Sequence, residues 1–294
     1  MNLKSKISIK DIEYVYFDMD GTLLTSNKTI SPRSIETLNK LWSRKISCSI
    51  ATGRPYYFAQ NEIKTLEPHL PIISCNGALV FDYNSKKIIS YDSIDKNTTK
   101  TIFDILIKNN AVFIIYTKEQ MFMYKDNATN PESKWLNWIY NHNNKFDISD
   151  RANISFIEDL DNFDIKEYDV IKFLIIYSEI PTERYSVIES NVSKLNDVYI
   201  VKSQNEVFDI MPKGLSKGHG LQVLHDKGII DLNKTLVFGD AENDLSMFAK
   251  AKWSVAMGNA QEKTKHAATF ITNSNNEDGI ANFFDKLFEA ENKE

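Results

Sequence analysis

An alternation of short apolar runs and helix-like segments constrains the fold of this chain more than any other feature. Apolar runs at 12–17, 45–51 and 71–81 are separated by segments with helical patterns at 31–44 and 56–67. The first run has little polarity, as expected for a strand that is covered on both faces. Strand, helix, strand, helix, strand in this order predicts a parallel sheet with right-handed crossovers.

The pattern changes in the middle of the chain and then returns. Residues 111–126 contain two β-rich runs on either side of Thr-Lys-Glu-Gln, which predicts a hairpin rather than a βα unit. Residues 234–240 again form an apolar run that ends in an acid. We therefore expect an α/β protein whose Rossmann-like parallel-sheet core is interrupted by an inserted α+β domain. The expected boundaries are 1–83 for the first core segment, 84–208 for the insert and 209–294 for the second core segment.

The composition is that of an ordinary soluble globular protein and argues against several classes of function. The chain has 294 residues, of which 42% are hydrophobic and 26% charged, and its net charge is −5. No Lys/Arg-rich stripe is present, so nucleic acid is not expected as a main partner. No apolar stretch approaches the roughly 18 residues of a membrane span, and the N-terminal residues lack the apolar region of a signal peptide. Cys48 and Cys75 lack metal-binding spacing, and two reduced thiols indicate a cytoplasmic protein.

Polar side chains stand at the ends of the predicted strands. Asp18 and Asp20 follow the first apolar run, Thr52 follows the second, and Asp240 ends a run in the last third of the chain. Lys217 lies at the start of a predicted helix. Ligands of open parallel sheets bind beyond the carboxyl ends of the strands, so we expect these side chains to converge on one edge of the sheet.

Three of these residues are carboxylates, which indicates a cation. Asp18 and Asp20 are too close together to remain uncompensated in a low-dielectric cleft, and Asp240 adds a third negative charge. Asn243 and Asp244 follow on the same face of a helix start. Oxygen ligands without Cys or His select a hard cation such as Mg²⁺. Because protein-bound Mg²⁺ completes its coordination with water and substrate phosphate, the pattern indicates a phosphate ligand.

Simpler interpretations of these segments compete with a metal site. The segment from Asp18 to Gly21 has the residue types of a surface turn, although a strong apolar run leads straight into it. It does not fit an EF-hand calcium loop, which needs glycine at the sixth position, whereas Gly21 is the fourth residue. Asp240 has a residue type that caps helices. Lys217 would also fit a solvated loop, and its surroundings lack the P-loop pattern.

Four short motifs resemble those of a known family. "DMDGTLL", "ATGR", "SKG" and "GDAENDLSMF" occur in this order, as the four motifs of the haloacid dehalogenase (HAD) superfamily do. The following "VAMGNA" and "NEDGIA" resemble its Cof-type sugar-phosphatase branch, and the insert resembles the type IIB cap in its topology. The likeness covers both core segments. It implies a Rossmann-like core with a mobile cap domain that closes over the site.

The resemblance implies a role for each residue of the first three motifs. Asp18 corresponds to the nucleophile and a Mg²⁺ ligand, and Asp20 to the general acid/base, whose backbone carbonyl also binds Mg²⁺. Thr52 and the amide of Gly53 correspond to groups that bind the transferring phosphoryl group. Lys217 corresponds to the cation that neutralises the phosphate and the nucleophile.

The fourth motif completes the implied site. Asp240 corresponds to a Mg²⁺ ligand, Asn243 to a neighbour of the phosphate, and Asp244 to a support of the metal site or of its waters. For Arg54, substrate contact and a structural role at the sheet edge remain open. Thr22 is expected to hold the general acid in place.

Together these features predict a Mg²⁺-dependent phosphoric monoester hydrolase that acts on small phosphorylated metabolites through an aspartyl-phosphate. One alternative is a phosphosugar mutase on the same core, although mutases of this superfamily usually have a small helical cap. Another is a non-catalytic metabolite-binding protein, against which the intact motif charges argue. Dehalogenase activity is disfavoured because that branch lacks the second aspartate. Sugar phosphates, nucleotides, flavin-related phosphates and pyridoxal phosphate all remain open as substrates, as does the oligomeric state.

Overall fold

The computed structural model describes residues 7–204 and 206–293, and the chain divides into two compact units. The core unit runs to Arg54, continues over Asn61–Ser90 and ends with Ser216–Glu294. The inserted unit contains Pro55–Gln60 and Tyr91–Leu215.

These divisions differ from the boundaries 84 and 208 that the sequence suggested. Strand β5 (Lys87–Tyr91) extends a sheet of the core unit, and strand β11 (Val207–Pro212) belongs to the large sheet of the inserted unit. A short segment after Arg54, Pro55–Gln60, also belongs to the inserted unit, where the Tyr57 hydroxyl lies within hydrogen-bond distance of the carbonyl oxygens of Thr117 and Gln120, at 2.9 and 2.8 Å. The chain therefore passes between the two units at four points, which follow Arg54, Gln60, Ser90 and Leu215.

The core unit is built on a five-stranded parallel sheet with strand order β14-β13-β12-β1-β2. Tyr14 aligns with Thr235 on one side and with Ser47 on the other, so β1 lies between β12 and β2 and runs parallel to both. The predicted α/β class is thereby confirmed. The strands are β1 (Tyr14–Phe17), β2 (Ser47–Ile50), β12 (Thr235–Gly239), β13 (Trp253–Ala256) and β14 (Phe270–Ile271).

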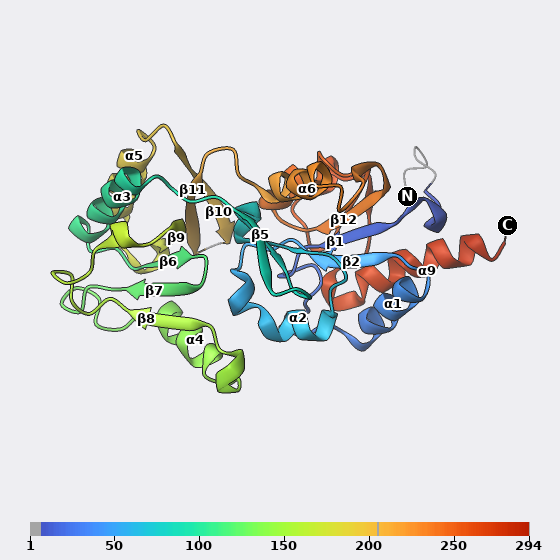
Figure 1. Ribbon diagram of the computed structural model, residues 1–294, viewed down its shortest axis with the longest axis horizontal. Coiled ribbons are helices and arrows are strands. Elements are labelled where there is room, and N and C mark those ends of the chain that lie inside the picture. Colours follow the sequence, from blue (N-terminus) through green and yellow to red (C-terminus); the bar gives the residue numbers. More distant parts are fainter. Residues whose placement is uncertain (1–6, 205, 294) are drawn as a thin grey trace. The chain divides into compact units, whose positions relative to one another are not determined.

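Helices cover both faces of this sheet because alternate strand residues point to opposite sides. Phe238 packs against Phe283 and Phe284 of α9, with ring centroids 5.4 and 5.6 Å apart. Tyr16 and its neighbours form a separate buried cluster with α6 and α7. Figure 1 shows α1 beside α9 on one side of the strands and α6 on the other. The helices are α1 (Pro32–Ser43), α2 (Gln60–Leu66), α6 (Lys217–Asp226), α7 (Leu245–Phe248), α8 (Glu262–Ala267) and α9 (Gly279–Glu291).

The run at 71–81, expected to be one strand of the parallel sheet, is two strands, and only the first makes a parallel bridge beside β2, between Ile73 and Ala51. Strand β3 (Ile72–Ser74) and strand β4 (Leu79–Asp82) are antiparallel and form a separate sheet with β5. They are joined by the turn Cys75–Gly77, in which all three residues have positive φ. An Asn-Gly pair is a strong turn signal, and it overrides the apolar residues on both sides.

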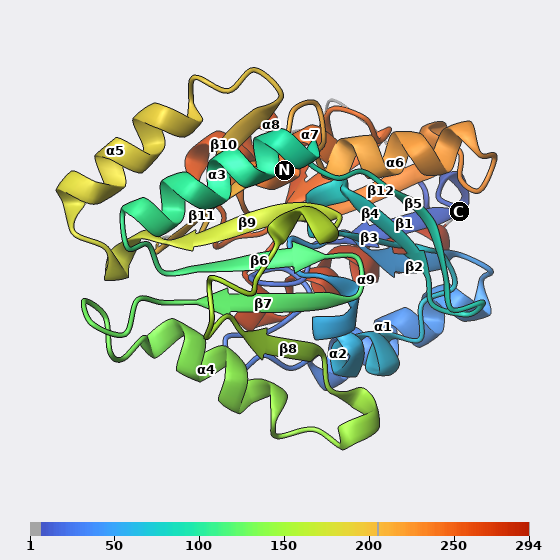
Figure 2. The same ribbon diagram turned by 60° about the vertical axis from the view of Figure 1, so that its left-hand side comes forward.

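The inserted unit contains a six-stranded sheet with order β10-β11-β9-β6-β7-β8. The predicted hairpin at 111–126 is confirmed, since β6 and β7 are antiparallel and pair Tyr116 with Met121. The strands are β6 (Phe113–Thr117), β7 (Gln120–Tyr124), β8 (Asn153–Phe156), β9 (Val170–Ile176), β10 (Val198–Gln204) and β11. Helices α3 (Lys96–Lys108) and α5 (Thr182–Val192) lie across one face of this sheet (Figure 2), and α4 (Lys134–Asn143) precedes β8.

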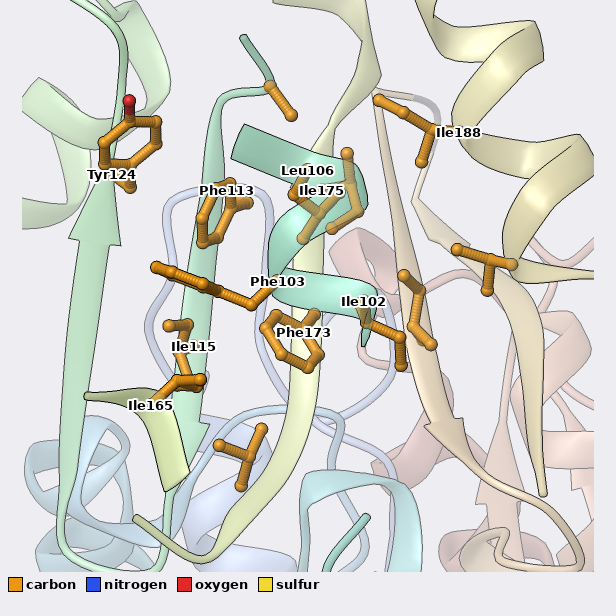
Figure 3. Close-up of a cluster of buried hydrophobic side chains, with 14 of the residues drawn as sticks. Ile102, Phe103, Leu106, Phe113, Ile115, Tyr124, Ile165, Phe173, Ile175 and Ile188 are labelled. Carbon is orange, nitrogen blue, oxygen red and sulfur yellow. The ribbon is translucent and has the colours of Figure 1, made fainter. Parts of the chain in front are cut away.

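The inserted unit has its own hydrophobic core. Figure 3 shows side chains of α3 directed at the sheet, where Phe103 meets Phe113 edge-on with ring centroids 6.0 Å apart. Phe173 and Ile175 of β9 belong to the same cluster and are fully buried. Burial of this kind is the main stabilising contribution in a domain of this size. Among the described residues, no helix is long and apolar enough to cross a membrane.

Candidate active site

The residues predicted from the strand ends converge in the core unit. Asp18 and Asp20 follow β1, Thr52 follows β2, Asp240 follows β12, and Lys217 is the first residue of α6. The parallel arrangement of β2, β1 and β12 places their carboxyl ends on one edge of the sheet, as the sequence predicted.

Lys217 lies at the centre of this edge and is fully buried. Its Nζ donates hydrogen bonds to Oδ1 of Asp18 at 2.5 Å and to Oδ1 of Asp244 at 2.6 Å. Ser216 caps the helix by accepting a hydrogen bond from the backbone N–H of His219, which fixes the start of α6. The surrounding carboxylates raise the pKa of Lys217 although burial alone would lower it, so its side chain is an ammonium ion.

Asp244 is held from two sides. Its Oδ1 accepts from Lys217, and its Oδ2 accepts from the backbone N–H groups of Asp240 and Ala241, at 2.8 and 2.9 Å. Both oxygens of this carboxylate are therefore already bound by donors of the chain. This arrangement favours Asp244 as a support of the site.

Asp240 is the more open carboxylate of the fourth motif. Its Oδ1 accepts from the Thr22 hydroxyl at 3.0 Å, and its Oδ2 accepts from Nδ2 of Asn259 at 3.2 Å. The expectation that Thr22 holds Asp20 is therefore wrong, since this hydroxyl binds Asp240. Gly21 has φ +85°, and a Cβ there would lie 2.4 Å from Oδ2 of Asp240, so only glycine fits between the two motifs.

The carboxylates of Asp18, Asp240 and Asp244 form a cluster that suits a hard cation. One oxygen from each lies within 4.8 Å of the others. Burial, with the charge of Asp244, raises the pKa of Asp240 to about 6. Burial also raises the pKa of Asp18 well above its usual range, against the opposing effect of Lys217. One ammonium group therefore does not compensate these carboxylates, and an all-oxygen donor set of this kind fits Mg²⁺.

Asp20 has different surroundings from Asp18. Arg54 binds its carboxylate with two hydrogen bonds, from Nε to Oδ2 at 2.8 Å and from Nη2 to Oδ1 at 2.6 Å. Lys28 donates to Oδ1 at 2.6 Å, and Glu62 holds Nη1 of Arg54 at 3.0 Å. Burial acts to raise the pKa of Asp20, but the charges of Arg54 and Lys28 outweigh it and lower the pKa to about 2. Arg54, whose role the sequence left open, is thus a partner of Asp20.

The loop after β2 is ordered by short backbone contacts. The N–H of Thr52 donates to the carbonyl of Ile73 at 2.8 Å, and the N–H of Arg54 donates to the Thr52 hydroxyl at 3.1 Å. Next to this loop, Nδ2 of Asn243 donates to Oδ1 of Asn76 at 3.0 Å. The sequence assigned no role to Asn76.

The sequence did not predict a role in the site for four polar residues of this edge: Lys28, Glu62, Asn76 and Asn259. Asn259 lies within "VAMGNA", a segment recognised as a motif without a role for its asparagine. The Asn-Gly pair at residue 76 carried a turn signal. Lys28 and Glu62 have no local signal, because their proximity to Asp20 and Arg54 depends on the tertiary fold.

Comparison with known proteins shows the same family over almost the whole chain. The family described as "haloacid dehalogenase-like hydrolase" matches residues 15–284, which include all four motifs. The "Putative phosphatase MG265" of Mycoplasma genitalium is 32% identical over 287 residues, covering 94% of this chain and 99% of that protein.

A further relative and a solved structure are similar to this chain over almost its whole length. The "5-amino-6-(5-phospho-D-ribitylamino)uracil phosphatase YwtE" of Bacillus subtilis is 27% identical, covering 94% of this chain and 98% of its own length. The crystal structure of a haloacid dehalogenase-like hydrolase from Bacteroides thetaiotaomicron has a TM-score of 0.78 at 26% identity, covering 94% of this chain and 99% of that one. The resemblance identified from the motifs is confirmed.

Proposed function

Because the chain belongs to the haloacid dehalogenase-like hydrolases, as a Cof-type phosphatase, we propose that it hydrolyses small phosphate monoesters through an aspartyl-phosphate on Asp18. The observation that carries this proposal is the buried contact of Lys217 with Asp18, beside the carboxylates of Asp240 and Asp244. It combines a nucleophile with a fixed positive charge and an oxygen donor set.

The first task of the site is to bring a phosphate dianion to a carboxylate. Like charges repel, so positive charge must offset the repulsion before attack. Lys217 supplies one such charge and is fixed by Asp18 and Asp244, so it needs no rearrangement when substrate arrives. Thr52 and Asn243 would donate to the phosphate oxygens, together with the amide of Gly53.

The second task is to move protons at the leaving and attacking oxygens. In the first step the Asp18 carboxylate forms a bond to phosphorus while the alcohol departs with a proton from Asp20. In the second step Asp20 takes a proton from the water that attacks the aspartyl-phosphate, and inorganic phosphate is released. Arg54 and Lys28 hold Asp20 as a carboxylate in the resting structure. Asp20 therefore takes up a proton from solvent when substrate binds and gives it to the departing alcohol, which leaves the carboxylate that the second step requires. The proton that Asp20 then takes from the attacking water returns to solvent.

We propose that Asp18, Asp240 and the backbone carbonyl of Asp20 hold Mg²⁺, with Asp244 supporting them. Bound Mg²⁺ would neutralise phosphate charge and orient the phosphoryl group. The contacts of Asp244 with Lys217 and with two backbone N–H groups give it a separate use, which is to fix the loop that carries Asp240.

The identity of the leaving alcohol is proposed to depend on the inserted unit, acting as the cap. The core residues recognise only phosphate, whereas the insert is a large module with its own core. The Bacillus subtilis relative is named for a phosphate carried on a ribityl chain. We therefore propose a phosphorylated sugar or polyol derivative as the substrate class. Cys48 and Cys75 are both buried and reduced, which fits a reducing compartment, and we propose the cytoplasm.

The test is a phosphate-release screen over sugar phosphates, polyol phosphates, nucleotides and pyridoxal phosphate, with and without Mg²⁺. We expect Mg²⁺-dependent release, fastest with a sugar or polyol phosphate. Asp18→Asn should lose more than roughly 10⁴-fold of this rate while keeping its circular dichroism spectrum, because an amide cannot form the acyl phosphate. Release by Asp18→Asn at a tenth of the wild-type rate would rule out the proposed mechanism.

A further inference from the structure

We infer that Asn76 is a positioning residue of the phosphate site. Its side-chain oxygen fixes the amide of Asn243, and its turn joins the loop of Thr52 to the start of the helix that carries Lys217. The inference rests on the proposed function, since it takes the phosphate to bind at Thr52 and Asn243.

The backbone conformation at residue 76 does not by itself explain an asparagine. Asn76 has φ 53° and ψ 36°, and the preceding Cys75 also has a positive φ of 50°. Glycine adopts this left-handed conformation with the least strain, and asparagine tolerates it. Asn76 is also almost completely buried, where a polar side chain needs partners. A buried asparagine at this position therefore points to a use for its amide.

The amide of Asn76 has such a use in orienting Asn243. Nδ2 of Asn243 donates one N–H to Oδ1 of Asn76 at 3.0 Å. Each amide nitrogen carries two N–H groups, so this bond fixes the amide plane and leaves a second N–H of Asn243 for a phosphate oxygen. Without this acceptor, the Asn243 amide would be free to rotate and present its oxygen to the phosphate.

The same turn holds the loop after β2. The N–H of Asn76 donates to the carbonyl of Thr52 at 2.9 Å, and the N–H of Cys75 donates to the carbonyl of Arg54 at 3.0 Å. The Ser74 hydroxyl donates to the same Arg54 carbonyl at 3.0 Å. A Cβ on Gly53 would lie 3.1 Å from Oδ1 of Asn76, so this side chain also lies against the loop.

The turn also approaches the start of α6. Gly77 has φ +90°, and a Cβ at this position would lie 1.9 Å from the carbonyl oxygen of Ser216, the residue before Lys217. Three segments that carry phosphate-site residues therefore meet at one turn. Its backbone sets the spacing of Thr52 and Lys217, while the Asn76 side chain sets the orientation of Asn243.

The test is Asn76→Gly, which keeps the left-handed backbone and removes the side chain with its amide. We expect a melting temperature close to that of wild type. We expect KM for p-nitrophenyl phosphate and the dissociation constant of inorganic phosphate, both measured with Mg²⁺, to rise about 10- to 100-fold, as for loss of a hydrogen bond to a charged group. Asn110→Gly is the matched control, because Asn110 also has a positive φ of 47° but lies in the inserted unit. It should behave as wild type.

A double-mutant cycle separates positioning from general damage to the fold. If Asn76 acts through Asn243, adding Asn76→Gly to Asn243→Ala should change phosphate binding by less than about 3-fold. An equal loss in both backgrounds, or no loss in the single variant, would overturn the inference. Phosphate binding is measured without turnover, so it is informative even if no ester is hydrolysed. Coupling in phosphate binding without hydrolysis would sink the proposed function and leave the role of Asn76 standing.

Discussion

Arg54 binds the carboxylate of Asp20 through a two-point contact, with Nε 2.8 Å from Oδ2 and Nη2 2.6 Å from Oδ1. Glu62 holds the other end of the guanidinium at 3.0 Å, so the orientation of the pair is fixed. The contact keeps Asp20 ionised, which suits proton removal from water but opposes proton donation to an alcohol. Proton donation by Asp20 therefore requires this pair to loosen when substrate binds.

Arg54→Met should lower turnover of an alkyl phosphate by roughly 10- to 100-fold, because Asp20 loses the partner that orients it and general acid–base assistance is worth about 10²–10⁴-fold. The measurement is steady-state phosphate release. Arg33→Met is the matched control, since Arg33 pairs with Asp285 at 2.7 Å on the same unit without contacting the site residues described above. Turnover by Arg54→Met at the wild-type rate would show that the contact has no role in the reaction.

The same pair predicts a dependence of stability on pH. In the folded, metal-free chain the pKa of Asp20 is about 2, below its ordinary value of 3.8. A lowered carboxyl pKa stabilises the fold above the unfolded value, and this stabilisation is lost as pH falls through the folded value. In EDTA, the difference in urea midpoint between wild type and Arg54→Met should be constant above pH about 5 and shrink as the pH falls toward 2. A difference that grows on acidification would contradict the assignment.

Asp240 and Asp244 should respond differently to substitution by asparagine. Asp240→Asn should raise the Mg²⁺ concentration for half-maximal activity by more than about 100-fold, because it removes a proposed ligand. Asp244→Asn should change this concentration less but lower the melting temperature, because it removes one of two carboxylates that pair with buried Lys217. Titration of activity with Mg²⁺ after EDTA treatment measures the half-maximal concentration for each variant, and thermal unfolding measures the melting temperature of Asp244→Asn. Full activity in EDTA would exclude a metal requirement.

The convergence of Asp18, Thr52 and Asp240 could be predicted because parallel strands place their carboxyl ends on one edge, whatever the details of packing. The turn at Asn76 was not predicted although its Asn-Gly pair is a turn signal, because apolar residues on both sides of it gave the pattern of one continuous strand. Two left-handed residues break that strand in the structure. A local sequence pattern also does not predict which residue a long side chain will contact. The contact of Arg54 with Asp20 depends on the tertiary fold.

Two short elements, β8 and α8, were not predicted because each is too short to show a periodic sequence pattern. Strand β8 (Asn153–Phe156) has four residues and is defined by its parallel pairing with β7. Helix α8 (Glu262–Ala267) has six residues, too few to show a helical period. Neither carries a candidate site residue, so their omission did not affect the functional prediction.

The central claim is that Asp18 carries the phosphoryl group while Asp20 moves the protons, and rapid mixing of Asp20→Asn with p-nitrophenyl phosphate tests it most directly. p-Nitrophenolate leaves without a proton, so this variant should release a burst of about one nitrophenol per active site and then turn over slowly, because water attack lacks its base. When the phosphate group of the substrate is labelled, acid quench should recover the label on Asp18. The same variant should show little or no burst with a sugar phosphate that the wild type cleaves. Near wild-type turnover of both substrates, or label on any residue other than Asp18, would contradict the mechanism.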